Sequence, residues 1–198
     1  MMIWLPVAGY LLGSIPFAFL LARGIGGVDV RAAGSGNVGA ANVLRTTRPS
    51  IAIAVVALDL AKGSVAVWLA GELGAEPAAR AATGVAAVVG HVYPAWLRFR
   101  GGKGVTVAAG AFSVLAPAAT AVAIAIFTTT VWATRFVSLG SVVAALALPP
   151  LVGSIEPAAG GDALVYAASA AATLIVFRHR TNLRRLLNRT ERRLGEAA

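Results

Sequence analysis

Long apolar stretches, separated by short segments that hold most of the charge, restrict this chain more than any other feature of its sequence. They cover about residues 1–22, 51–71, 81–97, 105–116, 118–133, 137–155 and 163–177. A bilayer core needs about 20 helical residues to cross it, and lipid cannot satisfy open backbone groups. We therefore predict an all-α polytopic transmembrane bundle of about seven spans, with six or five as alternatives. The short 105–116 stretch is expected to be tilted or re-entrant.

Composition supports an integral membrane protein. Hydrophobic residues make up 58% of the 198 residues and charged residues only 13%, whereas soluble domains are roughly 45–50% apolar. The first stretch is uncharged and has no basic segment before it, so we expect a retained span and no signal peptide. Because no linker or repeat divides the chain, residues 1–198 are expected to form a single integral-membrane domain.

The placement of charge predicts the orientation in the membrane. All but two of the 17 Lys and Arg residues lie in the segments 23–49 and 95–103, at Arg135, and in the tail from Arg178 onward. The other loops hold Glu72, Glu76, Glu156 and Asp162 against the single Arg80. Since loops rich in Lys and Arg stay in the cytoplasm, we expect the N-terminus outside and the C-terminus in the cytoplasm.

A net charge of +9 could indicate nucleic acid as a partner. The basic tail, however, directly follows a span and lacks interleaved aromatic residues, so membrane lipids are the expected neighbours and no nucleic acid is expected. No obligate protein partner is evident. The absence of cysteine excludes disulfides, thiolate metal sites and a cysteine nucleophile.

The loop 34–45 reads Gly-Ser-Gly-Asn-Val-Gly-Ala-Ala-Asn-Val-Leu-Arg. Glycines allow backbone N–H groups to curl around an oxyanion, while Ser, Asn and Arg side chains add donors and charge. A flexible connector is the alternative, but it would not need two asparagines and an arginine beside the glycines. We predict a phosphate-binding loop whose candidate residues are Gly34, Ser35, Gly36, Asn37, Asn42 and Arg45.

A second basic loop, 99–104, reads Phe-Arg-Gly-Gly-Lys-Gly and directly precedes the short apolar stretch. Lys103 would then lie near a helix N-terminus, where unbonded N–H groups and the positive helix end favour a phosphate. No Ser or Thr follows the lysine as a P-loop requires, so a nucleotide is not indicated. A cytoplasmic membrane anchor explains the arginines better than the glycines. The candidate phosphate-binding residues are Gly101, Gly102, Lys103 and Gly104.

Asp59 and Lys62 lie inside an apolar stretch at positions i and i+3, on one helix face. Either charge alone would cost about 2.5–3.5 kcal/mol on insertion scales, so we expect both to face the protein interior as an ion pair. Lys62 is given a supporting role in substrate binding. His91, which precedes the second basic loop, is expected to brace that loop or to help bind substrate.

The segment after the last span contains His179 and Asn182. A histidine at a helix end is either a capping residue or, beside a reacting group, an acid or base. The cytoplasmic segments hold only three carboxylates, Asp29, Glu191 and Glu196, without the paired aspartates that would hold Mg²⁺. We therefore expect no metal and no cofactor, and a site suited to phosphoryl groups and oxyanions.

Four motifs in this order resemble the PlsY family, the bacterial acyl-phosphate:glycerol-3-phosphate acyltransferases of phospholipid synthesis. They occupy residues 34–45, 58–63, 90–105 and 178–186, so the resemblance spans nearly the whole chain. The departures from the usual family pattern are Tyr93, Ala41, Arg100 and Arg189, and none removes a proposed charge.

The resemblance implies a seven-helix, multi-pass enzyme of the bacterial plasma (inner) membrane with its active site facing the cytoplasm. It would transfer a fatty acyl group from acyl phosphate to the 1-position of sn-glycerol 3-phosphate, giving lysophosphatidic acid and phosphate. By motif match, the catalytic residues are Ser35, Arg45, Lys103, His179 and Asn182.

The mechanism that we expect is direct attack in a cationic site that holds both phosphates, with His179 or a substrate phosphate oxygen accepting the proton. A covalent acyl-Ser35 is less favoured, because no carboxylate is evident to orient His179 as in a Ser-His-Asp triad. The alternatives from other classes are a transporter for an anionic metabolite and a lipid-binding scaffold protein.

Overall fold

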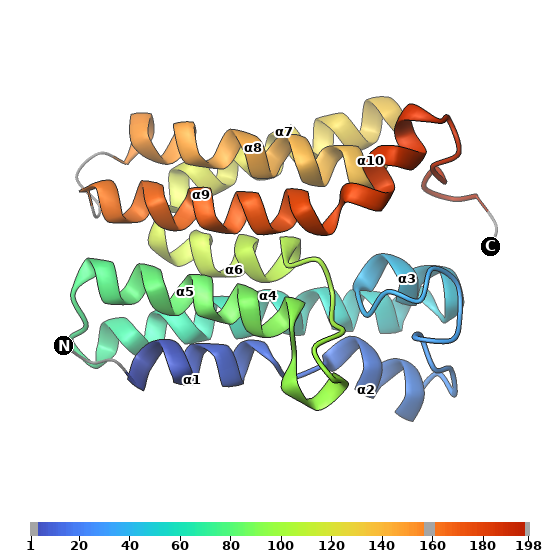
Figure 1. Cartoon of the computed structure of the whole chain (residues 1–198), viewed down its shortest axis with the longest axis horizontal. Coiled ribbons are helices and arrows are strands. Elements are labelled where there is room, and N and C mark those ends of the chain that lie inside the picture. Colours follow the sequence, from blue (N-terminus) through green and yellow to red (C-terminus); the bar gives the residue numbers. More distant parts are fainter. Residues whose placement is uncertain (1–3, 157–160, 197–198) are drawn as a thin grey trace.

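The computed structural model describes residues 4–156 and 161–196, and every regular element in that part of the chain is helical (Figure 1). The elements are α1 (Trp4–Gly13), α2 (Phe17–Gly24), α3 (Ala40–Thr46), α4 (Pro49–Glu72), α5 (Pro77–Val92), a 3₁₀ turn η1 (Ala95–Leu97), α6 (Val105–Leu115), α7 (Pro117–Thr134), α8 (Val137–Ile155), α9 (Gly161–Arg178) and α10 (Arg180–Leu187).

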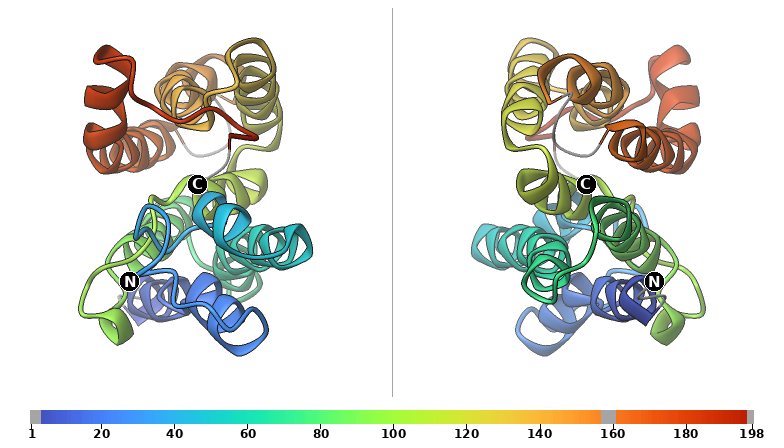
Figure 2. Two further views of the ribbon diagram at one scale, coloured as in Figure 1. Left: turned by 90° about the vertical axis from the view of Figure 1, so that its right-hand side faces the viewer. Right: turned by 90° about the vertical axis from the view of Figure 1, so that its left-hand side faces the viewer.

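The long helices run along one axis in two groups, α1, α4 and α5 on one side and α7, α8 and α9 on the other (Figure 1). Seen along that axis, α6 lies between the two groups (Figure 2). Helices α2, α3 and α10, the α7–α8 turn and the segment between α2 and α3 all gather at one end of the bundle. The basic segments of the sequence are therefore brought to the same end.

Five segments are long and apolar enough to cross a bilayer: Trp4–Gly24, α4, α7, α8 and α9. Helix α5 has 16 residues and α6 has 11. Eleven helical residues measure about 17 Å, roughly half the thickness of a bilayer core. The expectation of a short element before residue 116 is thus confirmed, while the count of seven spans stays a prediction.

Two of the expected stretches are divided by proline. The first breaks between α1 and α2, because Pro16 has no N–H and disfavours a helical conformation at the residue before it. The third ends as a helix at Val92 for the same reason, since Pro94 restricts Tyr93. The chain then turns through η1 into the second basic loop.

Glycines allow the helices of the first group to lie close together. A Cβ atom at Gly13 would overlap the backbone of α5 at Ala87, and one at Gly90 would overlap the backbone of α1. Gly63 and Gly110 make the same kind of approach between α4 and α6. Small residues that let helix backbones touch are the usual basis of packing in membranes, where burial of apolar surface provides little driving force.

A compact apolar cluster lies beneath the loop 34–45, the first basic loop, and positions it. Val30, Val38 and Val43, from the loop and α3, are buried against Val55 of α4 and Ala22 of α2. Three of these five side chains are valines of the segment 30–43, so the loop is held to the bundle by its own apolar residues. Apart from the buried Asn42, its polar residues stay at least partly exposed.

Candidate active site

Asn42 determines the shape of the first basic loop. Its side chain is buried, its Oδ1 accepts a hydrogen bond from the Ser35 N–H at 2.8 Å, and its Nδ2 donates to the carbonyls of Val30 and Ala33. Gly34 has φ +61°, and a Cβ atom there would overlap the Asn42 amide. Asn42, expected to bind substrate, therefore uses its amide groups to hold the loop.

The same loop also uses backbone donors that we expected to hold a phosphate. The Ser35 N–H is bonded to Asn42, and the Gly36 N–H donates to the Ala33 carbonyl at 3.1 Å. The Ser35 side chain is exposed, and those of Asn37 and Arg45 are half-buried. Side chains, more than backbone N–H groups, are thus the donors that this loop offers to a ligand.

The glycines of the second basic loop seat that loop on the end of α5. The N–H groups of Gly101 and Gly102 donate to the carbonyls of Val92 and His91, both at 3.1 Å. A Cβ atom at either glycine would overlap His91. The sequence-based expectation that these two N–H groups hold a phosphate is therefore wrong for this structure: they are bonded to α5, and the glycines are needed for close contact.

Gly104 is the N-cap of α6, with φ +87°, a conformation that glycine adopts without strain. No side chain caps this helix. The first N–H groups of α6 therefore face the same end of the loop as Lys103, and the positive end of the helix adds to the lysine charge. The expected position of Lys103 at a helix N-terminus is confirmed.

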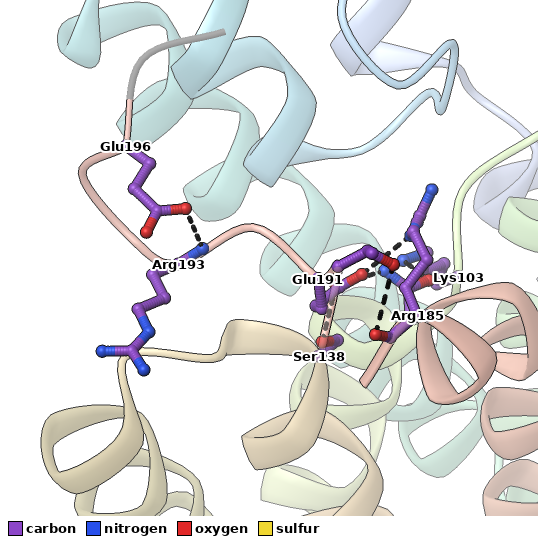
Figure 3. Close-up of polar contacts among 8 residues, drawn as sticks. Lys103, Ser138, Arg185, Glu191, Arg193 and Glu196 are labelled. Atoms are coloured by element: carbon purple, nitrogen blue, oxygen red, sulfur yellow. Dashed lines mark hydrogen bonds and ion pairs between the residues drawn. The ribbon is translucent and has the colours of Figure 1, made fainter. Parts of the chain in front are cut away.

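Lys103 belongs to a chain of polar contacts that reaches the C-terminal tail (Figure 3). Its Nζ donates to Asn182 Oδ1 at 2.6 Å, and Asn182 Nδ2 donates to Glu191 Oε1 at 2.6 Å. Glu191 also accepts hydrogen bonds from Ser138 Oγ and Arg185 Nε, both at 2.8 Å. These bonds hold the pKa of the Glu191 carboxyl below its usual value although burial opposes them.

The tail brings Glu191 to this place by folding over the α7–α8 turn. The Leu194 N–H donates to the Arg135 carbonyl at 2.7 Å, and the Arg135 guanidinium donates to the Leu194 carbonyl at 2.8 Å. Sequence reasoning gave Glu191 no role, because no helical periodicity relates residues 182 and 191. The weak signal was that it is one of only three carboxylates in the segments expected to be cytoplasmic.

His179 precedes α10 and is buried. Its Nδ1 lies 2.8 Å from the Ile175 carbonyl, so the ring donates from Nδ1 and carries its lone pair on Nε2. Burial, together with the positive charge of Lys103, lowers the pKa of His179 to about 4. The imidazole is therefore neutral near pH 7 and can accept a proton at Nε2.

Positive charge is crowded around Lys103. Burial lowers the pKa of Lys103 to about 8; the Glu191 carboxylate raises it, and the charges of Arg185, Arg45 and Arg178 lower it further. Arg45 comes from α3 and has no carboxylate within 4.0 Å in the described part of the chain. The geometry thus brings the predicted Arg45, Lys103, His179 and Asn182 to one region suited to anions.

Lys62 and His91 lie elsewhere, in a buried cluster with Asp59. The Lys62 Nζ atom has three partners within 3.0 Å: Asp59 Oδ1 at 2.9 Å, the Ile15 carbonyl at 2.9 Å and His91 Nδ1 at 3.0 Å. The predicted ion pair is confirmed. Lys62 is buried and its charge is matched by Asp59, so direct substrate binding by Lys62 does not fit this structure. The cluster instead supports the break between α1 and α2, through the Ile15 carbonyl, and the second basic loop, which lies against His91.

Within residues 4–156 and 161–196, no group of three or more His, Asp and Glu side chains is arranged to hold a metal ion. The chemistry that this end of the bundle can perform is binding of phosphoryl groups and transfer of a proton to a neutral imidazole.

Residues 3–189 match the family model described as glycerol-3-phosphate acyltransferase. The chain belongs to this family. A glycerol-3-phosphate acyltransferase of Geotalea daltonii is 46% identical over 185 residues, which cover 93% of each chain. One of Geobacter sulfurreducens is 44% identical over 191 residues, covering 96% of this chain and 95% of the relative. The resemblance seen in the four sequence motifs is confirmed.

Solved structures agree with this assignment to the glycerol-3-phosphate acyltransferases. The crystal structure of PlsY, an integral membrane glycerol 3-phosphate acyltransferase, in its glycerol 3-phosphate form has a TM-score of 0.90 and 34% sequence identity. The match covers 97% of this chain and 94% of that one. The lysophosphatidic acid form of PlsY has a TM-score of 0.88.

Proposed function

We propose that this protein transfers a fatty acyl group from acyl phosphate to the 1-hydroxyl of sn-glycerol 3-phosphate, giving lysophosphatidic acid and phosphate. Family membership supports glycerol 3-phosphate as the acceptor. The observation that carries the proposal is the gathering of Arg45, His179 and the Glu191 carboxylate around Lys103. Both substrates are anions, and an excess of positive charge would offset their repulsion.

In the proposed step, the 1-hydroxyl oxygen of glycerol 3-phosphate attacks the acyl carbonyl carbon. A C–O bond to glycerol forms, the bond from the carbonyl carbon to the phosphate oxygen breaks, and phosphate leaves with the electron pair. The hydroxyl proton passes to His179 Nε2 or to a phosphate oxygen of a substrate. Arg45 and Lys103 hold the phosphates in place, and the Ser35 hydroxyl donates a hydrogen bond.

The surroundings of His179 support direct attack over a covalent acyl-Ser35 intermediate. A Ser-His-Asp triad needs a carboxylate on the second ring nitrogen, whereas Nδ1 of His179 is bonded to the backbone carbonyl of Ile175. Without that carboxylate, His179 lacks the third member of the arrangement that activates a serine nucleophile. An acceptor hydroxyl held beside the carbonyl does not need the extra step.

We further propose seven crossings of a bacterial inner membrane, with the N-terminus outside and the site facing the cytoplasm. The clustering of the basic segments at one end of the bundle supports this orientation (Figure 1). It also argues against a transporter, whose substrate site would lie near the middle of the membrane between repeated halves. Acyl phosphate, glycerol 3-phosphate and membrane lipids are the proposed partners.

The test is to incubate the purified protein in detergent with acyl phosphate and glycerol 3-phosphate, without added metal or nucleotide. We expect equal amounts of lysophosphatidic acid and phosphate. Acyl-CoA and acyl-carrier protein, offered in place of acyl phosphate, should give no product. Product with acyl-CoA would refute the donor assignment, and an absence of product with every donor would refute the function.

A second experiment separates the two mechanisms. The protein is incubated with radiolabelled acyl phosphate in the absence of glycerol 3-phosphate, and the denatured chain is then analysed for label. We expect no labelled protein. Label that disappears in the Ser35→Ala variant would show that the acyl group passes through this serine.

A further inference from the structure

Arg178 ends α9, next to His179, and the sequence analysis gave it no role beyond membrane orientation. Its Nη2 donates to the Gly101 carbonyl at 3.2 Å. Its guanidinium carbon lies 5.6 Å from the centre of the Tyr93 ring. The side chain is therefore fixed between the second basic loop and Tyr93, the residue that follows α5.

Like Arg45, and unlike Arg31 and Arg185, Arg178 has no carboxylate partner in the described part of the chain. Arg31 lies 2.7 Å from Asp29, and Arg185 lies 2.8 Å from Glu191. Within the described part of the chain, Arg178 has no carboxylate within 4.0 Å, and its buried Nε has no hydrogen-bond partner. A buried donor without a partner costs free energy, which a bound acceptor would recover.

The neighbours of Arg178 show where such an acceptor would lie. Its positive charge lowers the pKa of Lys103 and of His179, after burial has lowered both, so it shares their surroundings. Like charges that are brought together repel one another until an anion lies between them. A guanidinium presents its N–H groups in a planar fork that matches two oxygens of a phosphoryl group.

We propose that Arg178 is a further phosphate-binding residue of this site. One nitrogen holds the Gly101 carbonyl, and the rest of the fork binds oxygens of a substrate phosphoryl group. The inference rests on the function proposed above. The phosphoryl group can come from glycerol 3-phosphate or from acyl phosphate, and the kinetics of a variant tell the two apart.

The test compares Arg178→Ala with Arg180→Ala. Arg180 is a matched control, because it is exposed, stacks 4.4 Å from the Phe177 ring and bonds the Phe177 carbonyl, so its removal takes the same charge from the same end. For both variants kcat, the KM of each substrate and inhibition by inorganic phosphate are measured on purified protein.

For Arg178→Ala we expect the inhibition constant of inorganic phosphate and the KM of one substrate to rise about 10- to 100-fold. This is the change in affinity that corresponds to losing one charge-assisted hydrogen bond. A rise in the KM of glycerol 3-phosphate alone would assign that phosphate, and a rise for acyl phosphate alone would assign the other. Arg180→Ala should change each constant less than about threefold. Arg178→Lys should recover only part, because an ammonium lacks the fork.

The proposal is overturned if Arg178→Ala lowers kcat without changing either KM or the inhibition by phosphate, because Arg178 would then only seat the loop. It is also overturned if the two alanine variants behave alike. Should Arg178→Ala fail to fold, Arg178→Gln, which keeps most of the side-chain volume, decides by the same constants. Failure of the proposed function is distinct, since the wild-type protein would then form no lysophosphatidic acid.

Discussion

The protein contains two concentrations of charge that are built on opposite plans. In the buried cluster, Lys62 has three partners within 3.0 Å, and Asp59 supplies the opposite charge. Around Lys103, several cations lie near the Glu191 carboxylate. Charges that are matched inside a bundle join helices together, whereas unmatched cations at its end are suited to binding anions.

The comparison is tested most strongly by breaking the matched cluster. Lys62→Met leaves Asp59 buried without its partner, so we expect the free energy of unfolding to fall by about 3–5 kcal/mol. Thermal unfolding in detergent measures this loss. The double variant Asp59→Leu/Lys62→Met should recover most of it, because no buried charge is then left alone.

Activity of the folded fraction of Lys62→Met should stay near that of the wild type. A large loss of kcat/KM with an unchanged unfolding temperature would contradict the comparison and would place Lys62 among the residues that contact substrate.

The opposite result is expected at Lys103. Lys103→Met removes a cation from the site while the hydrogen-bonded frame of Asn182, Glu191 and Ser138 stays in place. We expect kcat/KM to fall about 10²- to 10³-fold, the usual effect of losing one group that stabilises developing negative charge. The unfolding temperature should change little, because burying the Lys103 charge without a bound anion is itself unfavourable. Unchanged kinetics would remove Lys103 from the site.

Asn42 lies between these two cases, since it is a neutral buried group that shapes a binding loop. Asn42→Ala leaves the Ser35 N–H and two loop carbonyls without their partner, so we expect a loss of about 1–3 kcal/mol in unfolding free energy. The KM of substrate should rise as the loop loosens. Steady-state kinetics and thermal unfolding of one preparation measure both. Altered kinetics at full stability would instead indicate direct contact with substrate.

The smallest expected effect is that of pH. Lys103, with its pKa lowered to about 8, is charged below that pH and loses its proton as the pH rises through it. We therefore expect kcat/KM for glycerol 3-phosphate to fall about tenfold between pH 7 and pH 9, following the protonated fraction. Lys103→Arg should remove this decline, since arginine keeps its charge. A decline that persists in Lys103→Arg belongs to another group.

The sequence predicted the helical bundle and the gathering of the basic segments, because hydropathy and charge placement act over whole segments. It also predicted the Asp59–Lys62 pair, which depends only on spacing along one helix. The breaks at Pro16 and at Pro94 are also predicted by the sequence, since the effect of proline on the residue before it is local.

What sequence reasoning missed depends on which segments meet in the folded protein. The N–H groups of Gly101 and Gly102 are bonded to α5 because the loop turns back onto the end of that helix. Glu191 reaches Asn182 only because the tail folds over the α7–α8 turn, where Leu194 bonds Arg135. Neither contact leaves a period or a motif in the sequence.

The close packing of α1 against α5 has a consequence for how the protein is made. The Tyr10 hydroxyl donates to the Tyr93 carbonyl, so these partners are separated by 83 residues of chain. At a synthesis rate of about 5–20 residues per second, the ribosome needs roughly 4–17 s to add that length. During this interval the first helix lacks α5, the helix that its glycines approach. The first helix therefore reaches its final packing only after α5 has been inserted.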